Sequence, residues 1–250
     1  MNPYGVELIN AGYSYRKTRA VVDVTTTIAP GSITGLLGRN GSGKSTLAMM
    51  IAGQLKARGQ ILANGESIWE NPNVMPNIAL VSDSPAVFVD QRLTDTIALW
   101  TDSRPTFAPE VALKLLDVWE INTKKHPEKL SRGQQSAFYA ALGIASRSPL
   151  TIFDEVHLGM DAVIRREFYD ALLQDYVAHP RTIVMSSHNV EEIEDLLENV
   201  LILDAGRLVV SGSADDVRAA HSTPGRVASL VDVLAATRNR TTAADALQNL

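Results

Sequence analysis

Short runs of apolar and β-branched residues alternate along the chain with stretches of helical hydrophobic spacing. The runs predict strands at 21–28, 33–37, 78–81, 151–153, 182–185 and 200–203. Apolar residues at three- and four-residue spacing predict helices at 45–52, 109–119, 131–147, 161–177 and 190–198. Strands that alternate with helices are typical of a mostly parallel sheet with helices on both faces, so we expect an α/β fold.

Two regions depart from this alternation. The runs within 6–28 and 60–68 have no helical pattern between them, which predicts an antiparallel β lobe near the N-terminus. Residues 84–147 predict a helical lobe, because the hydrophobic spacing is helical from about residue 89 onward. We therefore expect one main domain over residues 1–221, followed by a tail at 222–250 that is helical or partly disordered.

Composition excludes several classes of protein. The 250 residues are 45% hydrophobic and 20% charged, as in an ordinary globular domain, and the net charge of -5 argues against a nucleic-acid-binding surface. The chain has no cysteine, which excludes disulfides and thiol catalysis and fits the cytoplasm. Neither a signal peptide nor an apolar stretch of membrane-spanning length is apparent, so we expect any membrane process to involve docking onto another polypeptide.

One glycine-rich segment predicts a nucleotide site. Residues 38–45 fit the pattern GxxxxGK[ST], follow the predicted strand at 33–37 and precede a predicted helix. Backbone N–H groups of such a loop surround phosphates, Lys44 reaches the β and γ phosphates, and Ser45 binds Mg²⁺. An accidental glycine-rich turn is the alternative, and the strand and helix on either side make it a rare one. The predicted nucleotide-binding residues of this segment are Gly38, Asn40, Gly41, Ser42, Gly43, Lys44, Ser45 and Thr46.

Two adjacent carboxylates follow a buried strand pattern. Asp154 and Glu155 come directly after the apolar run at 151–153, where open α/β sheets bind their ligands. Neighbouring strand residues point in opposite directions, so the two carboxylates can have different roles. Asp154 suits Mg²⁺ and Glu155 suits a general base that activates water. Without the phosphate loop, the pair would be read as a solvated strand end.

A polar helix start precedes the acidic strand. Ser131 and Gln134 have the spacing of a capping box, and a helix cap is the plain interpretation. The segment 130–134 also resembles the LSGGQ signature of the ATP-binding cassette (ABC) ATPases. Together with the phosphate loop and the acidic strand, this identifies the chain as similar to that family over about residues 5–216.

The resemblance assigns roles to residues outside the phosphate loop. It implies that Tyr15 stacks on adenine, that Asp161 belongs to a loop contacting the partner subunit, and that His188 contacts the γ phosphate. Each position has a structural alternative: a strand aromatic for Tyr15, a helix cap for Asp161 and a backbone-bonded loop histidine for His188. The catalytic residues implied are Glu155, His188 and Lys44.

The resemblance also implies a head-to-tail dimer of two cassettes, either identical or different. ATP would lie between the phosphate loop of one subunit and the signature helix of the other, since helix N-termini attract anions. The residues facing the partner's ATP would be Ser131, Arg132, Gly133, Gln134 and Asp161. The implied cofactor is Mg²⁺, and its protein ligands would be Ser45, Asp154 and, less securely placed, Asp83.

The chain departs from the family pattern at three places. Asp83 stands where the family has a glutamine that touches Mg²⁺, and it adds a negative charge near Glu155. Arg132 replaces a signature glycine, and Val156-His157 replaces the usual Pro-Thr after the acidic pair. The histidines other than His188 show no metal-binding spacing, so the sequence predicts no chemistry for them.

The function implied by the resemblance is that of an ATP-hydrolysing subunit of an ABC transporter. It would be peripheral on the inner face of the cell membrane, bound to separate transmembrane subunits, and local sequence near 159–176 resembles bacterial export-type cassettes. Val87, Phe88 and Leu93 could line a groove for a membrane subunit, although core packing is the more frequent role. The alternatives are a soluble ABC ATPase acting on ribosomes or DNA, and another phosphate-loop enzyme such as a GTPase or kinase.

Overall fold

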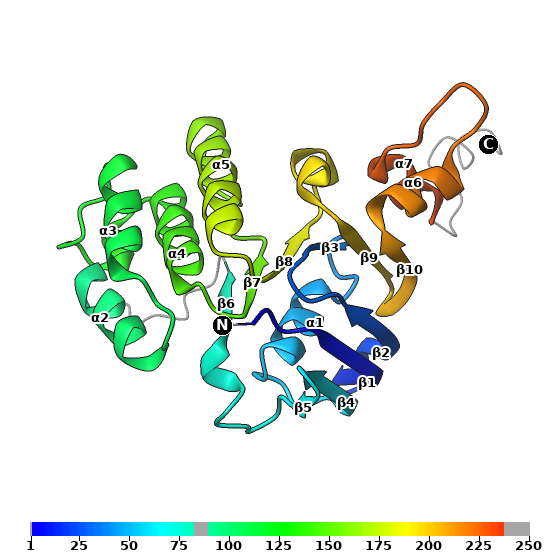
Figure 1. Cartoon of the computed structure of the whole chain (residues 1–250), viewed down its shortest axis with the longest axis horizontal. Coiled ribbons are helices and arrows are strands. Elements are labelled where there is room, and N and C mark those ends of the chain that lie inside the picture. Colours follow the sequence, from blue (N-terminus) through cyan, green and yellow to red (C-terminus); the bar gives the residue numbers. More distant parts are fainter. Residues whose placement is uncertain (1, 83–89, 238–250) are drawn as a thin grey trace.

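The computed structural model describes residues 2–82 and 90–237, which form two β-sheets and the helices around them (Figure 1). The antiparallel sheet has the strand order β2-β1-β4-β5, and the larger sheet has the order β10-β9-β3-β8-β7-β6. The strands are β1 (Val6–Tyr15), β2 (Thr18–Ile28), β3 (Ile33–Leu37), β4 (Arg58–Ala63), β5 (Glu66–Ser67), β6 (Ile78–Ser82), β7 (Leu150–Asp154), β8 (Thr182–Ser187), β9 (Asn199–Asp204) and β10 (Arg207–Ser213). The α-helices are α1 (Lys44–Ile51), α2 (Leu93–Ser103), α3 (Pro109–Val118), α4 (Arg132–Ser146), α5 (Ala162–Ala178), α6 (Ala214–His221) and α7 (Leu230–Ala236).

The larger sheet brings the candidate residues to one edge. Strands β6, β7, β8, β3 and β9 run parallel, and only β10 pairs antiparallel. The register pairs Leu37 with Ser187, and Asp154 with both Ser186 and Ser82. The phosphate loop, the acidic pair and His188 therefore leave the sheet at the carboxyl ends of neighbouring strands, where such sheets bind ligands.

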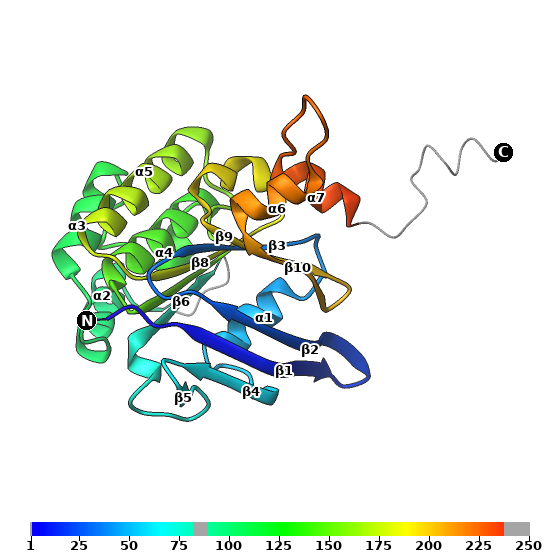
Figure 2. The same ribbon diagram turned by 45° about the vertical axis from the view of Figure 1, so that its right-hand side comes forward.

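Helix α1 lies between the two sheets, as Figure 2 shows. Its residues Leu47, Met50 and Ile51 are almost completely buried and pack in one apolar cluster with both sheets. A helix that is apolar on most sides requires such an environment, because it has no face suited to water. The phosphate loop is thereby attached to a helix held from both sides.

Helices α4 and α5 cover the opposite face of the larger sheet. A Cβ atom on Gly143 of α4 would lie 2.4 Å from Phe153 Cε1, so the glycine allows α4 to lie directly on β7. The helices α2 and α3 extend this layer beyond the edge strand β6, and Trp100 packs against Phe107 at 5.8 Å between ring centroids. The fold class expected from the sequence is confirmed.

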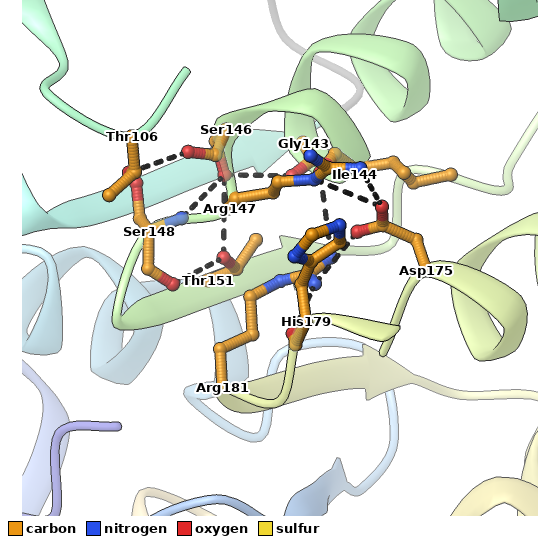
Figure 3. A network of polar contacts seen from close by, with 10 residues as sticks. All are labelled: Thr106, Gly143, Ile144, Ser146, Arg147, Ser148, Thr151, Asp175, His179 and Arg181. Carbon is orange, nitrogen blue, oxygen red and sulfur yellow. Dashed lines mark hydrogen bonds and ion pairs between the residues drawn. The ribbon is translucent and has the colours of Figure 1, made fainter. Parts of the chain in front are cut away.

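A network of charged and polar side chains joins α4, α5 and β8 at the amino ends of the central strands (Figure 3). Asp175 Oδ1 accepts from Arg147 Nη2 at 2.7 Å, and its Oδ2 accepts from Arg181 Nη1 at 2.9 Å. The Arg181 side chain is only 2% exposed and also donates to the carbonyl oxygen of His179 at 3.1 Å. Each buried charge here has an opposite charge from the same chain.

The prediction of a helix at 190–198 is wrong. The structure has two short 3-10 turns, Val190–Glu192 and Glu194–Leu196, although Val190 and Ile193 are buried as the pattern required. Distant groups fix the acidic side chains: Glu194 accepts from the backbone N–H of Leu230 at 2.9 Å, and Glu198 from that of Ile33 at 3.2 Å. These tertiary contacts overrode the local helical spacing.

Candidate functional site

The phosphate loop is shaped by glycines in the left-handed region. Gly38 has φ +149° and Gly43 has φ +105°, and Gly43 immediately precedes α1. A Cβ atom on Gly38 would lie 2.5 Å from the Leu203 carbonyl oxygen, and one on Gly43 would lie 2.4 Å from that of Ala20. The loop therefore needs glycine at both positions, and it leads directly into the N-terminus of α1, where N–H groups favour anions.

Lys44 lies at the centre of the site. Its side chain is 4% exposed, and Nζ donates to the carbonyl oxygens of Gly38 at 2.9 Å and Arg39 at 3.2 Å. The same nitrogen is 3.1 Å from Glu155 Oε1. The loop thus folds around its own ammonium group, which is held against the candidate base.

Glu155 is positioned by β8, by Lys44 and by His188. Its backbone has φ +50°. Its N–H donates to the carbonyl oxygen of Ser186 at 3.3 Å and to Ser186 Oγ at 3.1 Å. His188 Nδ1 lies 3.2 Å from Glu155 Oε1. Burial alone would raise the pKa of Glu155, but the charge and hydrogen bond of Lys44 and the contact with His188 outweigh burial and lower it.

Asp154 differs from Glu155 although the two are adjacent. It is 7% exposed, and its carboxylate accepts hydrogen bonds from the hydroxyl groups of Ser186 and Ser45. Burial raises the pKa of Asp154, and the two hydroxyl groups oppose that rise. A divalent cation would stabilise this buried carboxylate, and carboxylate and hydroxyl oxygens are the ligands that Mg²⁺ prefers. Ser45 and Asp154 therefore fit such an ion, although the described residues contain no group of three or more acidic, histidine or cysteine side chains that would hold a metal by themselves.

An open cavity of about 440 Å³ lies beside these residues. Lys44, Ser45, Thr46 and Glu155 line it, which places the phosphate loop and the candidate base on one cavity. The other residues lining it are Thr18, Arg19, Ala20, Asn40, Gly41 and Gly43.

Tyr15 is not among the residues lining this cavity. It is 44% exposed and meets Tyr13 edge-on, with 4.9 Å between the ring centroids. The start of β2 contributes Thr18 and Arg19 to the cavity instead, and no sequence motif marks these positions. Stacking of Tyr15 on adenine stays a prediction.

The signature segment forms a helix cap and a packing contact. Ser131 Oγ accepts from the backbone N–H of Gln134 at 3.3 Å, and Gln134 Oε1 accepts from that of Ser131 at the same distance. A Cβ atom on Gly133 would lie 2.7 Å from the Gly159 carbonyl oxygen, so this glycine lets α4 approach the loop before α5. The segment thus has a structural role within its own subunit, and its contact with a partner's ATP stays a prediction.

Asp161 is the N-cap of α5. Its Oδ1 accepts from the backbone N–H groups of Val163 at 2.9 Å and Ile164 at 3.0 Å. The alternative of a helix cap is therefore present in the structure, and it leaves the second carboxylate oxygen of Asp161 available for another contact.

Part of the expected site lies outside the described residues. Asp83, the doubtful Mg²⁺ ligand, is one of these, and so are Val87 and Phe88 of the expected docking groove. Leu93 is described and completely buried in the helical lobe, which agrees with core packing.

Comparisons with known proteins agree with the geometry. The family model for ABC transporter matches residues 21–157, more than half of the chain. The sulfate/thiosulfate import ATP-binding protein CysA of Mesorhizobium japonicum is 30% identical over 230 residues, which cover 88% of this chain and 66% of that protein. The ABC transporter ATP-binding protein YtrB of Bacillus subtilis is 28% identical over 214 residues, covering 85% of this chain and 73% of that protein. The chain thus spans about two thirds of the length of these relatives.

Solved structures share the fold. A structure described as the ATP binding subunit of an ABC transporter superposes with a TM-score of 0.81 at 22% identity, covering 92% of this chain and 98% of that one. A bacterial Atm1-family ABC exporter with ATP bound superposes with a TM-score of 0.73 at 21% identity, over 89% of this chain and 41% of that one. Among residues 2–82 and 90–237, no helix combines the length and apolar character needed to cross a membrane.

Proposed function

The chain belongs to the ABC transporter family of ATPases, and on that premise we propose that it is the ATP-hydrolysing subunit of a transporter with separate membrane-spanning subunits. The observation that carries this proposal is the contact of one carboxylate oxygen of Glu155 with Lys44 of the phosphate loop and with His188. A phosphate-binding cation, a candidate base and a candidate γ-phosphate contact are thus adjacent.

Binding begins with the phosphates of ATP. The N–H groups of the loop and of the first turn of α1 surround them, and Lys44 reaches the β and γ phosphates. Mg²⁺, held by Ser45, Asp154 and phosphate oxygens, would neutralise the charge that develops on the phosphates. Asp154 would then be stabilised in its charged form, in spite of its burial.

Phosphate binding also activates Glu155. Without nucleotide, Lys44 lowers the pKa of Glu155. When Lys44 binds a phosphate, the negative charge of the phosphate offsets part of the positive charge that acts on Glu155, and the pKa of Glu155 rises. Glu155 becomes more basic, and it can accept a proton from the water that attacks the γ phosphate. His188, from the end of β8, holds the water and the γ phosphate in line with Glu155.

A second cassette would complete the site. The signature residues from Ser131 to Gln134 do not line the cavity of their own subunit among the described residues, and they expose the N-terminus of α4. The positive end of this helix suits the γ phosphate bound by a partner subunit. The dimer would form around two ATP molecules in a head-to-tail arrangement.

A groove between α2 and the edge of the larger sheet suits a membrane subunit. Its volume is about 240 Å³, and the exposed apolar residues Met75 and Leu99 line it with Leu80. Arg104, also in the lining, lies over the ring of Trp100 at 3.9 Å. The groove would take a short apolar helix with a carboxylate opposite Arg104, and the chain would reside at the inner face of the membrane through this contact.

The names of similar proteins bear on the direction of transport. The export-type subclass expected from local sequence is not supported by CysA, which is named for import of sulfate or thiosulfate. PotG of Escherichia coli is named for putrescine transport. It is 29% identical to this chain over a match that covers 85% of this chain and 58% of the length of PotG.

The site assignment is tested by sedimentation of Glu155→Gln with ATP and Mg²⁺. The amide removes negative charge from the closed site and disables the base, so the variant should bind ATP and accumulate as a dimer. Glu128→Gln, in an exposed residue, is the matched control and should behave like the unmodified protein. A Glu155→Gln variant that stays monomeric and hydrolyses ATP at the normal rate would refute the proposed role. If the natural dimer contains two different cassettes, the other cassette is added.

Docking is tested by co-purification with the membrane-spanning subunits of the assembled transporter. Arg104→Glu reverses the charge of the groove and should prevent co-purification while ATP binding persists. Co-purification that is equal for both forms would place the membrane contact elsewhere.

A further inference from the structure

His157 is a buried residue of the loop that connects Glu155 to the N-cap Asp161. It is 2% exposed, although the loop lies near the surface of the site. Its carbonyl oxygen accepts from the backbone N–H of Met160 at 3.2 Å, which shapes the loop. Its ring nitrogen Nε2 lies 3.4 Å from Ser187 Oγ, on the strand that leads to His188.

The hydrogen-bond capacity of Ser187 determines the state of this ring. Ser187 Oγ donates its proton to the carbonyl oxygen of Asn189 at 3.0 Å and accepts from the N–H of Asn189 at 2.9 Å. A hydroxyl group has one proton to donate and two acceptor positions. The second acceptor position therefore faces Nε2, and the arrangement is complete when Nε2 carries the proton of a neutral ring.

A second connection runs between the same two loops. Asn189 Nδ2 donates to Glu192 Oε1 at 2.7 Å, and Arg165 Nη1 lies 3.1 Å from that oxygen. Arg165 belongs to the first turn of α5, where its N–H donates to the carbonyl oxygen of Asp161 at 3.0 Å. The contacts form a closed ring from the loop before α5, through Glu192 and Asn189, back to His157.

This ring is adjacent in the chain to the contact between the candidate base and the candidate γ-phosphate residue. Glu155 lies two residues before His157, and His188 directly follows Ser187. We propose that His157 is a positioning residue, whose hydrogen bond to Ser187 holds the loop of His188 at a fixed distance from Glu155. The inference rests on the proposed function, since it assigns the reacting groups that His157 aligns.

Burial keeps the ring suited to this task. It lowers the pKa of His157 to about 4, and the charges facing the ring are Glu155, which opposes that shift, and Arg165 and His188, which add to it. The ring also packs near Tyr169, with 6.3 Å between the centroids. Because the protonation of the ring changes little near pH 7, its hydrogen bond to Ser187 keeps the same donor and acceptor there.

The kinetic test compares two replacements of His157. His157→Leu keeps an apolar side chain but removes the donor, and we expect kcat for ATP hydrolysis to fall between about tenfold and a hundredfold, as misplacement of reacting groups does. The KM for ATP should change less than about threefold, because the phosphate loop is untouched. His157→Gln, whose amide N–H replaces the Nε2 donor, should recover most of kcat. Tyr169→Phe removes only a hydroxyl group that has no hydrogen-bond partner in the described structure and is the matched control.

Three results would overturn the inference. These are an unchanged kcat in His157→Leu, an equal fall in His157→Gln, and a rise in KM with kcat retained. Should His157→Leu fail to fold, Ser187→Ala removes the acceptor instead, and it should lower kcat by a similar factor.

A measurement without nucleotide separates this inference from the proposed function. In protein labelled with ¹⁵N-histidine, the Nε2 proton of His157 should give a persistent resonance at pH 7, and Ser187→Ala should abolish it. A ring that exchanges its proton freely and titrates near 6.5 would contradict the positioning role, whether or not the protein hydrolyses ATP.

Discussion

Strands β7 and β8 have buried ionic groups at both ends, and the two ends are built in opposite ways. At the amino end, both oxygens of Asp175 are engaged by Arg147 and Arg181 (Figure 3). At the carboxyl end, Asp154 is held by hydroxyl groups while burial raises its pKa. Charges that neutralise one another within the chain contribute to the fold, whereas a buried carboxylate short of positive charge is suited to a cation from solution.

The geometry of the neighbouring residues supports this distinction. Arg147 is a left-handed C-cap of α4 and joins it to α5 through Asp175, so it fixes the positions of helices. Lys44 instead faces a cavity of about 440 Å³ together with Glu155. Substitution at the amino end should therefore change stability, and substitution at the carboxyl end should change binding and turnover.

The largest expected effect is on turnover at the carboxyl end. Glu155→Gln should lower kcat for ATP hydrolysis by about 10²- to 10⁴-fold, the usual contribution of a general base. Its free energy of unfolding should fall less than that of Asp175→Ala, because Lys44 Nζ keeps its hydrogen bonds to the carbonyl oxygens of Gly38 and Arg39 when the carboxylate is replaced by an amide. Steady-state hydrolysis and urea unfolding of the same preparation check both statements. A variant with normal turnover would remove Glu155 from the chemistry.

The second effect is on stability at the amino end. Asp175→Ala leaves the buried guanidinium group of Arg181 and the partly exposed one of Arg147 without their carboxylate. It should lower the free energy of unfolding by about 3–5 kcal/mol. Asp170→Ala is the control on the same helix, because its pair with Arg166 is exposed and contributes under about 1 kcal/mol. Urea unfolding measures both. Equal small losses would mean that the network of Asp175 does not stabilise the fold.

A smaller effect distinguishes the two ends by pH. The pKa of His157 is lowered to about 4 by burial from 6.5, so on acidification the unfolded chain takes up a proton before the folded one does. This contribution is constant above pH 6.5 and destabilises the fold as the pH falls toward 4. Between pH 7 and pH 5 the loss should be about 2 kcal/mol.

His157→Gln isolates this contribution. Its free energy of unfolding should depend less on pH over that interval, while the arginines of the amino end stay charged throughout. Urea unfolding at pH 7 and pH 5 compares the variant with the unmodified protein. The same pH dependence in both would show that His157 is accessible to protons in the folded state.

The sequence predicted what depends on local order. The phosphate loop between 33–37 and α1 was predicted because strand, glycines and helix are consecutive, and the acidic pair because it directly follows β7. The contact of Glu155 with His188 joins residues 33 positions apart. It depends on the pairing of β7 with β8, and no local pattern specifies which strands pair.

Other features depended on distant groups in the same way. Gly133 was expected to allow the approach of a partner's phosphate, and the structure adds the carbonyl oxygen of Gly159 as a reason within the subunit. No local pattern indicates a role for His157, because its partner Ser187 lies 30 residues away. The α-helix predicted at 190–198 does not form, because acidic side chains of this segment accept hydrogen bonds from backbone N–H groups of β3 and α7.

The central claim is that the carboxyl end of the sheet binds the phosphates of ATP, and a calorimetric titration tests it most directly. Mg²⁺ and ATP are titrated into the unmodified protein, into Lys44→Ala, and into Arg147→Ala at the opposite end, each first shown to be folded. Loss of a charged hydrogen-bond donor to phosphate should weaken ATP binding by about tenfold to more than a hundredfold in Lys44→Ala. Arg147→Ala should bind as the unmodified protein does. Equal affinity for ATP in Lys44→Ala and the unmodified protein would contradict the account.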